Sequence, residues 1–122
     1  MSYDFYKVLH ITGLLILFTS LGALLLAAFQ GQGKEYIGKK FAGMMHGVGL
    51  LVALVGGFGL VARLQLEQGM MAPWVIAKLF IWLALGGVIA LVNRKQDKAK
   101  LWSIVIIILG ATAAYIARTK PF

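Results

Sequence analysis

The sequence has no cysteine and only four acidic residues among 122. The absence of cysteine excludes disulfides, thiolate catalysis and cysteine-ligated metal centres. The four acids all lie outside the long apolar runs: Asp4, Glu35, Glu67 and Asp97. A proton-coupled antiporter of the small multidrug type needs a carboxylate inside the membrane, so the position of these acids argues against that class.

Apolar residues dominate what is present. Hydrophobic residues make up 61% of the chain, charged residues make up 13%, and the mean hydropathy is +0.88. A soluble domain averages about 45–50% apolar and about 25% charged residues. The composition therefore predicts an integral membrane protein, with residues 1–122 forming a single transmembrane domain whose partner is the lipid bilayer. The net charge of +8 lies between the apolar runs, where it suits lipid headgroups, so no nucleic-acid partner is expected.

Four apolar runs divide the chain, at about 8–29, 41–62, 72–92 and 101–117. Each run has roughly 17 to 22 residues, which is enough to cross a hydrocarbon core of about 30 Å as a helix. Only helices or a closed barrel satisfy the backbone in lipid, and continuous apolar runs of this length favour helices. The sequence therefore predicts an all-α fold, an antiparallel four-helix bundle in the membrane.

Basic residues are unequally divided between the two sides of this bundle. One side has Lys7, Arg63, Arg118 and Lys120, whereas the other has Lys34, Lys39, Lys40, Arg94, Lys95, Lys98 and Lys100. Loops rich in lysine and arginine stay in the cytoplasm, so the second side is expected to be cytoplasmic. This topology leaves both termini outside.

Three ionisable residues lie within the apolar runs: His10, His46 and Lys78. A lysine at such depth costs roughly 2.5–3.5 kcal/mol, so Lys78 is expected to have a partner or a function, unless its side chain reaches the headgroups. Each histidine has a structural alternative, a hydrogen bond to a carbonyl, a headgroup or a neighbouring helix. The functional alternative is an imidazole that ligates a cofactor or handles protons.

Depth separates the three candidates. His10 and Lys78 follow the starts of the first and third runs, whereas His46 follows the start of the second, on the opposite side of the membrane. The two histidines are then roughly 20 Å apart along the membrane normal, too far to bind one iron together. The sequence instead predicts an outward-facing His10–Lys78 pocket, which Tyr115 could join and where Gly13 leaves room for a flat ligand beside the imidazole.

Small residues form two further stripes. Gly43, Gly47 and then Gly56 or Gly57 follow one side of the second run, with Ala53 between them. Gly43-x-x-x-Gly47 matches the spacing that lets helix backbones approach closely. A second small face in the fourth run comprises Gly110, Ala113, Ala114 and Ala117. These stripes favour an alternative function, a non-enzymatic helical module that packs with itself through Gly43, Gly47 and Gly57 or with a larger membrane partner.

Three short motifs open the first three runs: Tyr6-Lys7-Val8-Leu9-His10, Met45-His46-Gly47 and Pro73-Trp74-Val75-Ile76-Ala77-Lys78-Leu79. Together they resemble the SirB family of small four-helix membrane proteins, which implies the inner membrane of a bacterium. The layout is also similar to that of HemJ-type protoporphyrinogen oxidases. That resemblance implies haem b or a porphyrin as cofactor and a redox or porphyrin-oxidising role. His10 and His46 would then be metal ligands or proton-handling groups, and Lys78 would contact a propionate or assist proton removal.

Overall fold

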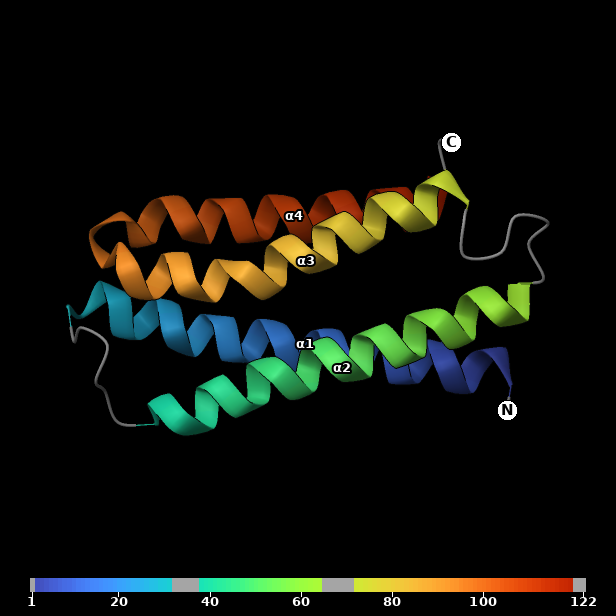
Figure 1. Ribbon diagram of the computed structural model, residues 1–122, viewed down its shortest axis with the longest axis horizontal. Helices are drawn as coiled ribbons and strands as arrows, with labels where there is room; N and C mark the ends of the chain where they lie inside the picture. The colour runs from blue at the N-terminus through green and yellow to red at the C-terminus, as the bar shows by residue number, and fades with distance from the viewer. Residues whose placement is uncertain (1, 32–37, 65–71, 120–122) are drawn as a thin grey trace.

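The computed structural model describes residues 2–31, 38–64 and 72–119, and within these ranges it contains helices and no strand. The helices are α1 (Tyr3–Phe29), α2 (Lys39–Leu64), α3 (Pro73–Arg94) and α4 (Ala99–Thr119), with a single 3₁₀ turn, η2 (Gln96–Lys98), before α4 (Figure 1). The all-α prediction is confirmed. Each of the four predicted apolar runs lies in a helix that is long and apolar enough to cross a membrane.

The helices extend beyond the apolar runs, most clearly at the start of α1. Ser2 is the N-cap of α1, and the backbone N–H of Phe5 donates to its hydroxyl oxygen at 3.1 Å. Asp4 lies in the first turn, where its negative charge interacts favourably with the positive end of the helix dipole. α1 therefore begins at Tyr3, before the apolar run predicted to start at residue 8. α3 begins with Pro73, whose missing N–H costs nothing at that position.

Glycines bring α1 and α2 into close contact. At three positions a glycine brings the two backbones together: Gly13 against Ala53, Gly49 against Leu17, and Gly56 against His10. A Cβ atom at Gly49 would lie 2.6 Å from the backbone nitrogen of Leu17, so a residue with a side chain cannot occupy that position without moving a helix. The residue numbers of the pairs rise along α1 as they fall along α2, so these two helices run in opposite directions.

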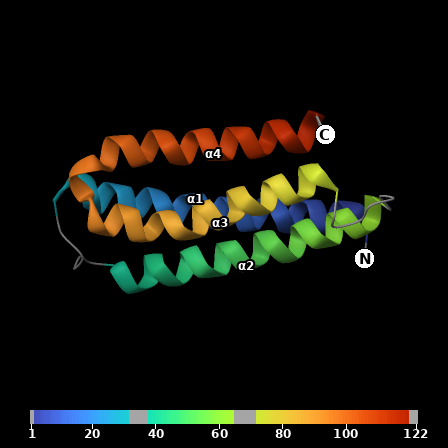
Figure 2. The same cartoon turned by 45° about the horizontal axis from the view of Figure 1, so that its top comes forward.

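The four helices form three layers. α1 and α3 lie in the middle, α2 covers one side of them and α4 covers the other, and no contact joins α2 to α4 within the described ranges (Figure 2). α1 and α3 begin at the same end of the molecule, where α2 and α4 end (Figure 1). Residues near the starts of α1 and α3 therefore lie at a similar level.

The core consists of two separate clusters. The larger joins all four helices and includes Leu17, Leu21, Leu24, Ala42, Leu85, Val88, Val92 and Ile106. The smaller comprises Val61, Ala72 and Val75, with Trp74 packed against it. On α3, Lys78 lies between Val75 of the smaller cluster and Leu85 of the larger, and the interior beside it is incompletely filled.

Candidate functional site

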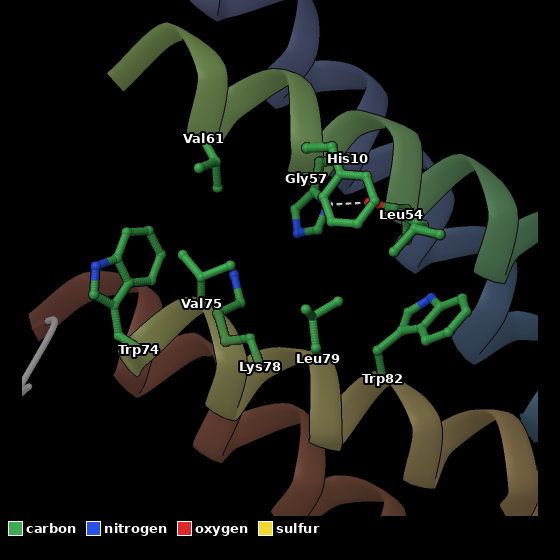
Figure 3. Close-up of a pocket in the computed structure, with 11 residues that line it drawn as sticks. His10, Leu54, Gly57, Val61, Trp74, Val75, Lys78, Leu79 and Trp82 are labelled. Atoms are coloured by element: carbon green, nitrogen blue, oxygen red, sulfur yellow. Dashed lines mark hydrogen bonds between the residues drawn. The ribbon is translucent and has the colours of Figure 1, made fainter. Parts of the chain in front are cut away.

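Two cavities meet at His10 and Lys78. The first, which we call the α2-side cavity, lies between α1, α2 and α3 and has a volume of about 80 Å³ (Figure 3). The second, the α4-side cavity, lies between α1, α3 and α4 and has a volume of about 190 Å³. Four residues line both cavities: His10, Ala53, Lys78 and Trp82. We call the two cavities together the His–Lys site.

The ring of His10 is held in one orientation by α2. Its Nδ1 lies 2.7 Å from the carbonyl oxygen of Ala53, and because a carbonyl only accepts, Nδ1 carries the proton and donates it. In the neutral ring, Nε2 then keeps its lone pair. In Figure 3 this second ring nitrogen points into the α2-side cavity, toward the side occupied by Lys78. His10 thus offers the cavity an acceptor, or a ligand nitrogen.

Lys78 enters the same space from α3. Its position is about 8 Å from the start of α3, and His10 is about 10 Å from the start of α1. Since both helices start at the same end of the molecule, the two residues lie at one level. The walls beside Lys78 are apolar and include Trp74, Val75 and Leu79. Among the described residues that line the two cavities, none is an aspartate or glutamate, and the basic side chains are Lys78 and His10.

His46 lies elsewhere, in a structural position. It is 5% exposed, and its Nε2 donates to the carbonyl oxygen of Leu85 at 3.1 Å, which ties α2 to α3. The α2 residues that contact His10 are Ala53, Gly56 and Gly57, which follow His46 by seven to eleven positions. This separation is roughly 10–16 Å along the helix. The structure therefore brings His10 and Lys78 together and leaves His46 outside the His–Lys site.

We expect His46→Ala to lower the free energy of unfolding by about 1–3 kcal/mol, because it removes a buried hydrogen bond between helices. Thermal unfolding of the detergent-purified protein measures this change. His46→Gln, which keeps an N–H donor, serves as the control and is expected to lose less. Equal stability of wild type and His46→Ala would contradict a structural role for this bond.

Two expectations about the pocket are wrong. Gly13 leaves no room for a flat ligand beside His10, because the backbone of Ala53 occupies the space next to it. Tyr115 does not join the pocket: it is 61% exposed and lines neither cavity. Both errors have the same origin, since the rotation of a helix about its own axis decides which of its residues face a neighbour.

The glycines of the predicted stripe also face different surroundings. No heavy atom lies within 4 Å of the Cβ position at Gly43 or Gly47, and both are exposed. Gly57 instead lies against the ring of His10, with its Cβ position 3.3 Å from Nδ1. Gly43 and Gly47 are therefore open to a partner, whereas Gly57 belongs to the His–Lys site.

Other residues of the site were not predicted. Trp82 follows Lys78 by one helical turn, lines both cavities, and donates from Nε1 to the carbonyl oxygen of Leu50 at 3.0 Å. The small face of α4, predicted as a packing surface, lines the α4-side cavity through Gly110, Ala113, Ala114 and Ala117. The i, i+4 spacing of Lys78 and Trp82 was the available signal for a shared face.

A haem or porphyrin does not fit these cavities as they stand. Pockets for molecules of drug size occupy about 300–1,000 Å³, more than either cavity offers. Within the described residues no group of three or more histidine, aspartate or glutamate side chains could hold a metal ion. His10 could supply one axial nitrogen through Nε2, and the register of α2 prevents His46 from reaching the same metal.

The His–Lys site combines one cation, one nitrogen lone pair and apolar walls. Such a set can bind an anion or a strong hydrogen-bond acceptor that carries an apolar group. Among the described residues that line the cavities, none carries a carboxylate or a thiol. Comparison of the chain with protein-family models, with curated proteins and with solved structures found no match.

Proposed function

We propose that the chain is an integral membrane protein, an antiparallel bundle whose four helices cross the bilayer. Large hydrophobic side chains on every helix are exposed, among them Leu15, Leu51, Phe80 and Ile107. Soluble monomers rarely expose contiguous apolar patches of more than a few hundred Å². Lipid acyl chains would cover these side chains at no cost, which supports insertion.

The charge at the two ends supports an orientation. Among the described residues one end carries Lys39, Lys40, Arg94, Lys95, Lys98 and Lys100, and the other carries Lys7, Arg63 and Arg118. The positive-inside rule assigns the first end to the cytoplasm, so both termini lie outside, as in a bacterial inner membrane. In this orientation the His–Lys site is in the outer half of the bilayer.

The His–Lys site binds a small amphiphilic anion, such as the carboxylate of an acid with a hydrocarbon chain. The observation that supports this function is that His10 and Lys78 line the same two apolar cavities. The ammonium of Lys78 attracts the carboxylate, and this attraction is stronger in low-dielectric surroundings than in water. Nε2 of His10 accepts a hydrogen bond from Lys78 or from the protonated acid.

The apolar walls bind the hydrocarbon chain of this ligand. Trp74 and Leu79 line the α2-side cavity, and the small face of α4 provides the volume of the α4-side cavity. Because the two cavities share His10, Lys78 and Trp82 as a wall, a ligand can place its head at this wall and its chain on one side. Medium-chain acids match the size of the α4-side cavity.

Octanoate is expected to bind saturably to the protein in phosphatidylcholine nanodiscs, and octanol, which lacks the charge, is expected to bind at least about tenfold more weakly. Tryptophan fluorescence reports binding in a Trp102→Phe background, because Trp74 and Trp82 line the α2-side cavity and Trp102 lines neither. Equal binding of the acid and the alcohol would contradict an anion site.

A matched pair of variants tests the position of the chain. Ala113→Leu fills the α4-side cavity and is expected to weaken octanoate binding by about tenfold, roughly the effect of a few lost methylene contacts. Ala111→Leu adds the same volume on the exposed face of α4 and is expected to bind like the wild type. Equal binding by both variants would place the ligand elsewhere.

A porphyrin is the second candidate: the hydrogen bond of His10 favours it, although it would need the helices around the two cavities to move apart. Ligand histidines usually donate their other ring N–H to a carbonyl or carboxylate, as Nδ1 of His10 does to Ala53. The visible spectrum of the purified protein titrated with haemin tests it, with His10→Ala and His46→Ala alongside. A Soret band that is lost only in His10→Ala supports this candidate, and a wild type without such a band removes it.

A further inference from the structure

A third cavity lies away from the His–Lys site, between the second half of α1 and the first turns of α2. This α1–α2 groove has a volume of about 370 Å³. Its apolar walls include Ala23, Leu26 and Ala27 of α1 and Phe41, Ala42 and Met45 of α2. Its volume falls in the range of about 300–1,000 Å³ that binding pockets occupy. The proposed function does not use this groove.

The groove exists because α1 and α2 separate toward this end. Their close contacts are at Gly13, Gly49 and Gly56, and beyond these the first turns of α2 diverge from α1 in both views (Figures 1 and 2). Ala23 and Ala27 face the gap with single methyl groups and do not fill it. The result is an apolar slot that runs along the two helices.

Polar and basic groups surround the end of this slot. Gln30 and Gly38 lie at its end, and Thr19 and Ser20 contribute hydroxyl groups along it. Ser20 is 3% exposed and donates to the carbonyl oxygen of Leu17 at 2.6 Å, which leaves its oxygen lone pairs directed away from that bond. Gln30, at the end of α1, matches the ester and glycerol region of a lipid, whereas Thr19 and Ser20 lie roughly 15 Å further along the helix, beside the acyl chain.

The charge beside the slot is positive. Lys39 and Lys40 begin α2 immediately after Gly38 and before Phe41, both of which line the groove. Among the described residues Asp97 is the sole acid at this end, against the six basic residues named above. The positive end of the α2 dipole adds to this potential. An anionic headgroup is therefore the complement of the groove's end, and an acyl chain is the complement of its walls.

We propose that the α1–α2 groove binds one anionic phospholipid, with an acyl chain between the two helices and its phosphate beside Lys39 and Lys40. The lipid fills the volume that α1 and α2 leave between them and neutralises the basic start of α2. This site is independent of the His–Lys site, since the two cavities of that site and the groove share no lining residue.

Native mass spectrometry tests the proposal on the full chain, with phosphatidylglycerol and phosphatidylcholine of identical acyl chains as probes. Wild type is expected to retain phosphatidylglycerol in preference to phosphatidylcholine. Lys40→Gln should reduce that preference about fivefold, the effect of one lysine close to an anionic lipid surface. Lys98→Gln removes the same charge from η2, which does not line the groove, and should preserve the preference.

A second pair of variants tests the place of the acyl chain. Ala23→Phe fills the groove from an exposed position and is expected to abolish retention of both lipids, whereas Ala90→Phe, exposed on α3, is expected to retain them as the wild type does. Retention of phosphatidylglycerol by Ala23→Phe at the wild-type level would overturn the proposal. So would equal retention of the two lipids by wild type, or displacement of the lipid by inorganic phosphate alone, which would identify a phosphate site.

Discussion

Gly13→Ala is expected to destabilise the protein by about 3 kcal/mol, the upper part of the range for overpacked interiors. The added Cβ would overlap the backbone nitrogen of Ala53 in α2. A flexible side chain could move aside, but a helix backbone can do so only if the whole of α2 shifts. Because Gly49 and Gly56 hold α2 against α1 on the same face, that shift would break three close contacts at once. Unfolding in mixed micelles of increasing denaturing detergent measures the loss.

Gly47→Ala is the matched control. It makes the same chemical change on α2 at a position where no heavy atom lies within 4 Å of the added Cβ. The gain in helix propensity is about 0.5–1 kcal/mol, so this variant is expected to be as stable as the wild type or slightly more stable. If both variants unfolded at the same detergent fraction, the close approach of α1 and α2 would be contradicted.

The four helices could be predicted because lipid imposes a simple requirement. A run of apolar residues long enough to cross the hydrocarbon must be helical, and four such runs are visible in the sequence. Hydropathy identifies which residues can lie in lipid, not where a helix ends. The start of α1 at Tyr3 depends on the cap at Ser2 and on Asp4, which are polar and therefore lie outside any apolar run.

The packing of α2 could not be predicted to the same degree. Gly43 and Gly47 match the motif for close approach, but α1 packs on a second stripe of small residues, Gly49, Ala53 and Gly56. The expected stripe had included Ala53 and, as one of two choices, Gly56. Both stripes satisfy the same steric condition. The choice between them depends on where the neighbouring helix offers its own small residue, here Gly13, and a single helix sequence does not contain that information.

The level of the site could be predicted, and its walls could not. His10 and Lys78 were expected in the same half of the membrane, about 6 Å apart in depth and within reach of the lysine side chain, and the structure has them on the same cavities. Which residue of α4 faces them depends on the rotation of that helix. Ala113 faces the α4-side cavity and Tyr115 does not, although the two are separated by a single residue.

Lys78→Met is expected to weaken octanoate binding by at least about tenfold, because a charge-assisted hydrogen bond is worth about 1.5–3 kcal/mol and each 1.4 kcal/mol is a factor of ten. Methionine preserves the length and the apolar stem of the side chain, so the cavities keep their shape. Lys78→Arg keeps the charge and is expected to retain most of the affinity. Lys7→Met removes a charge from the same end of the molecule outside both cavities, and its affinity should match that of the wild type.

The same substitution distinguishes a lysine that binds the ligand from one that is merely accommodated in the membrane segment. Membrane insertion of the segment 73–94, measured by glycosylation mapping, should become more favourable in Lys78→Met by about 2.5–3.5 kcal/mol, since the charged group no longer enters the bilayer. If replacing Lys78 improves insertion, the lysine makes membrane insertion of the wild type less favourable. Octanoate binding then tests whether the lysine serves a ligand. Wild-type affinity for octanoate in Lys78→Met would mean that the charge is not needed by the His–Lys site. Lost affinity together with easier insertion would mean that the lysine binds the ligand.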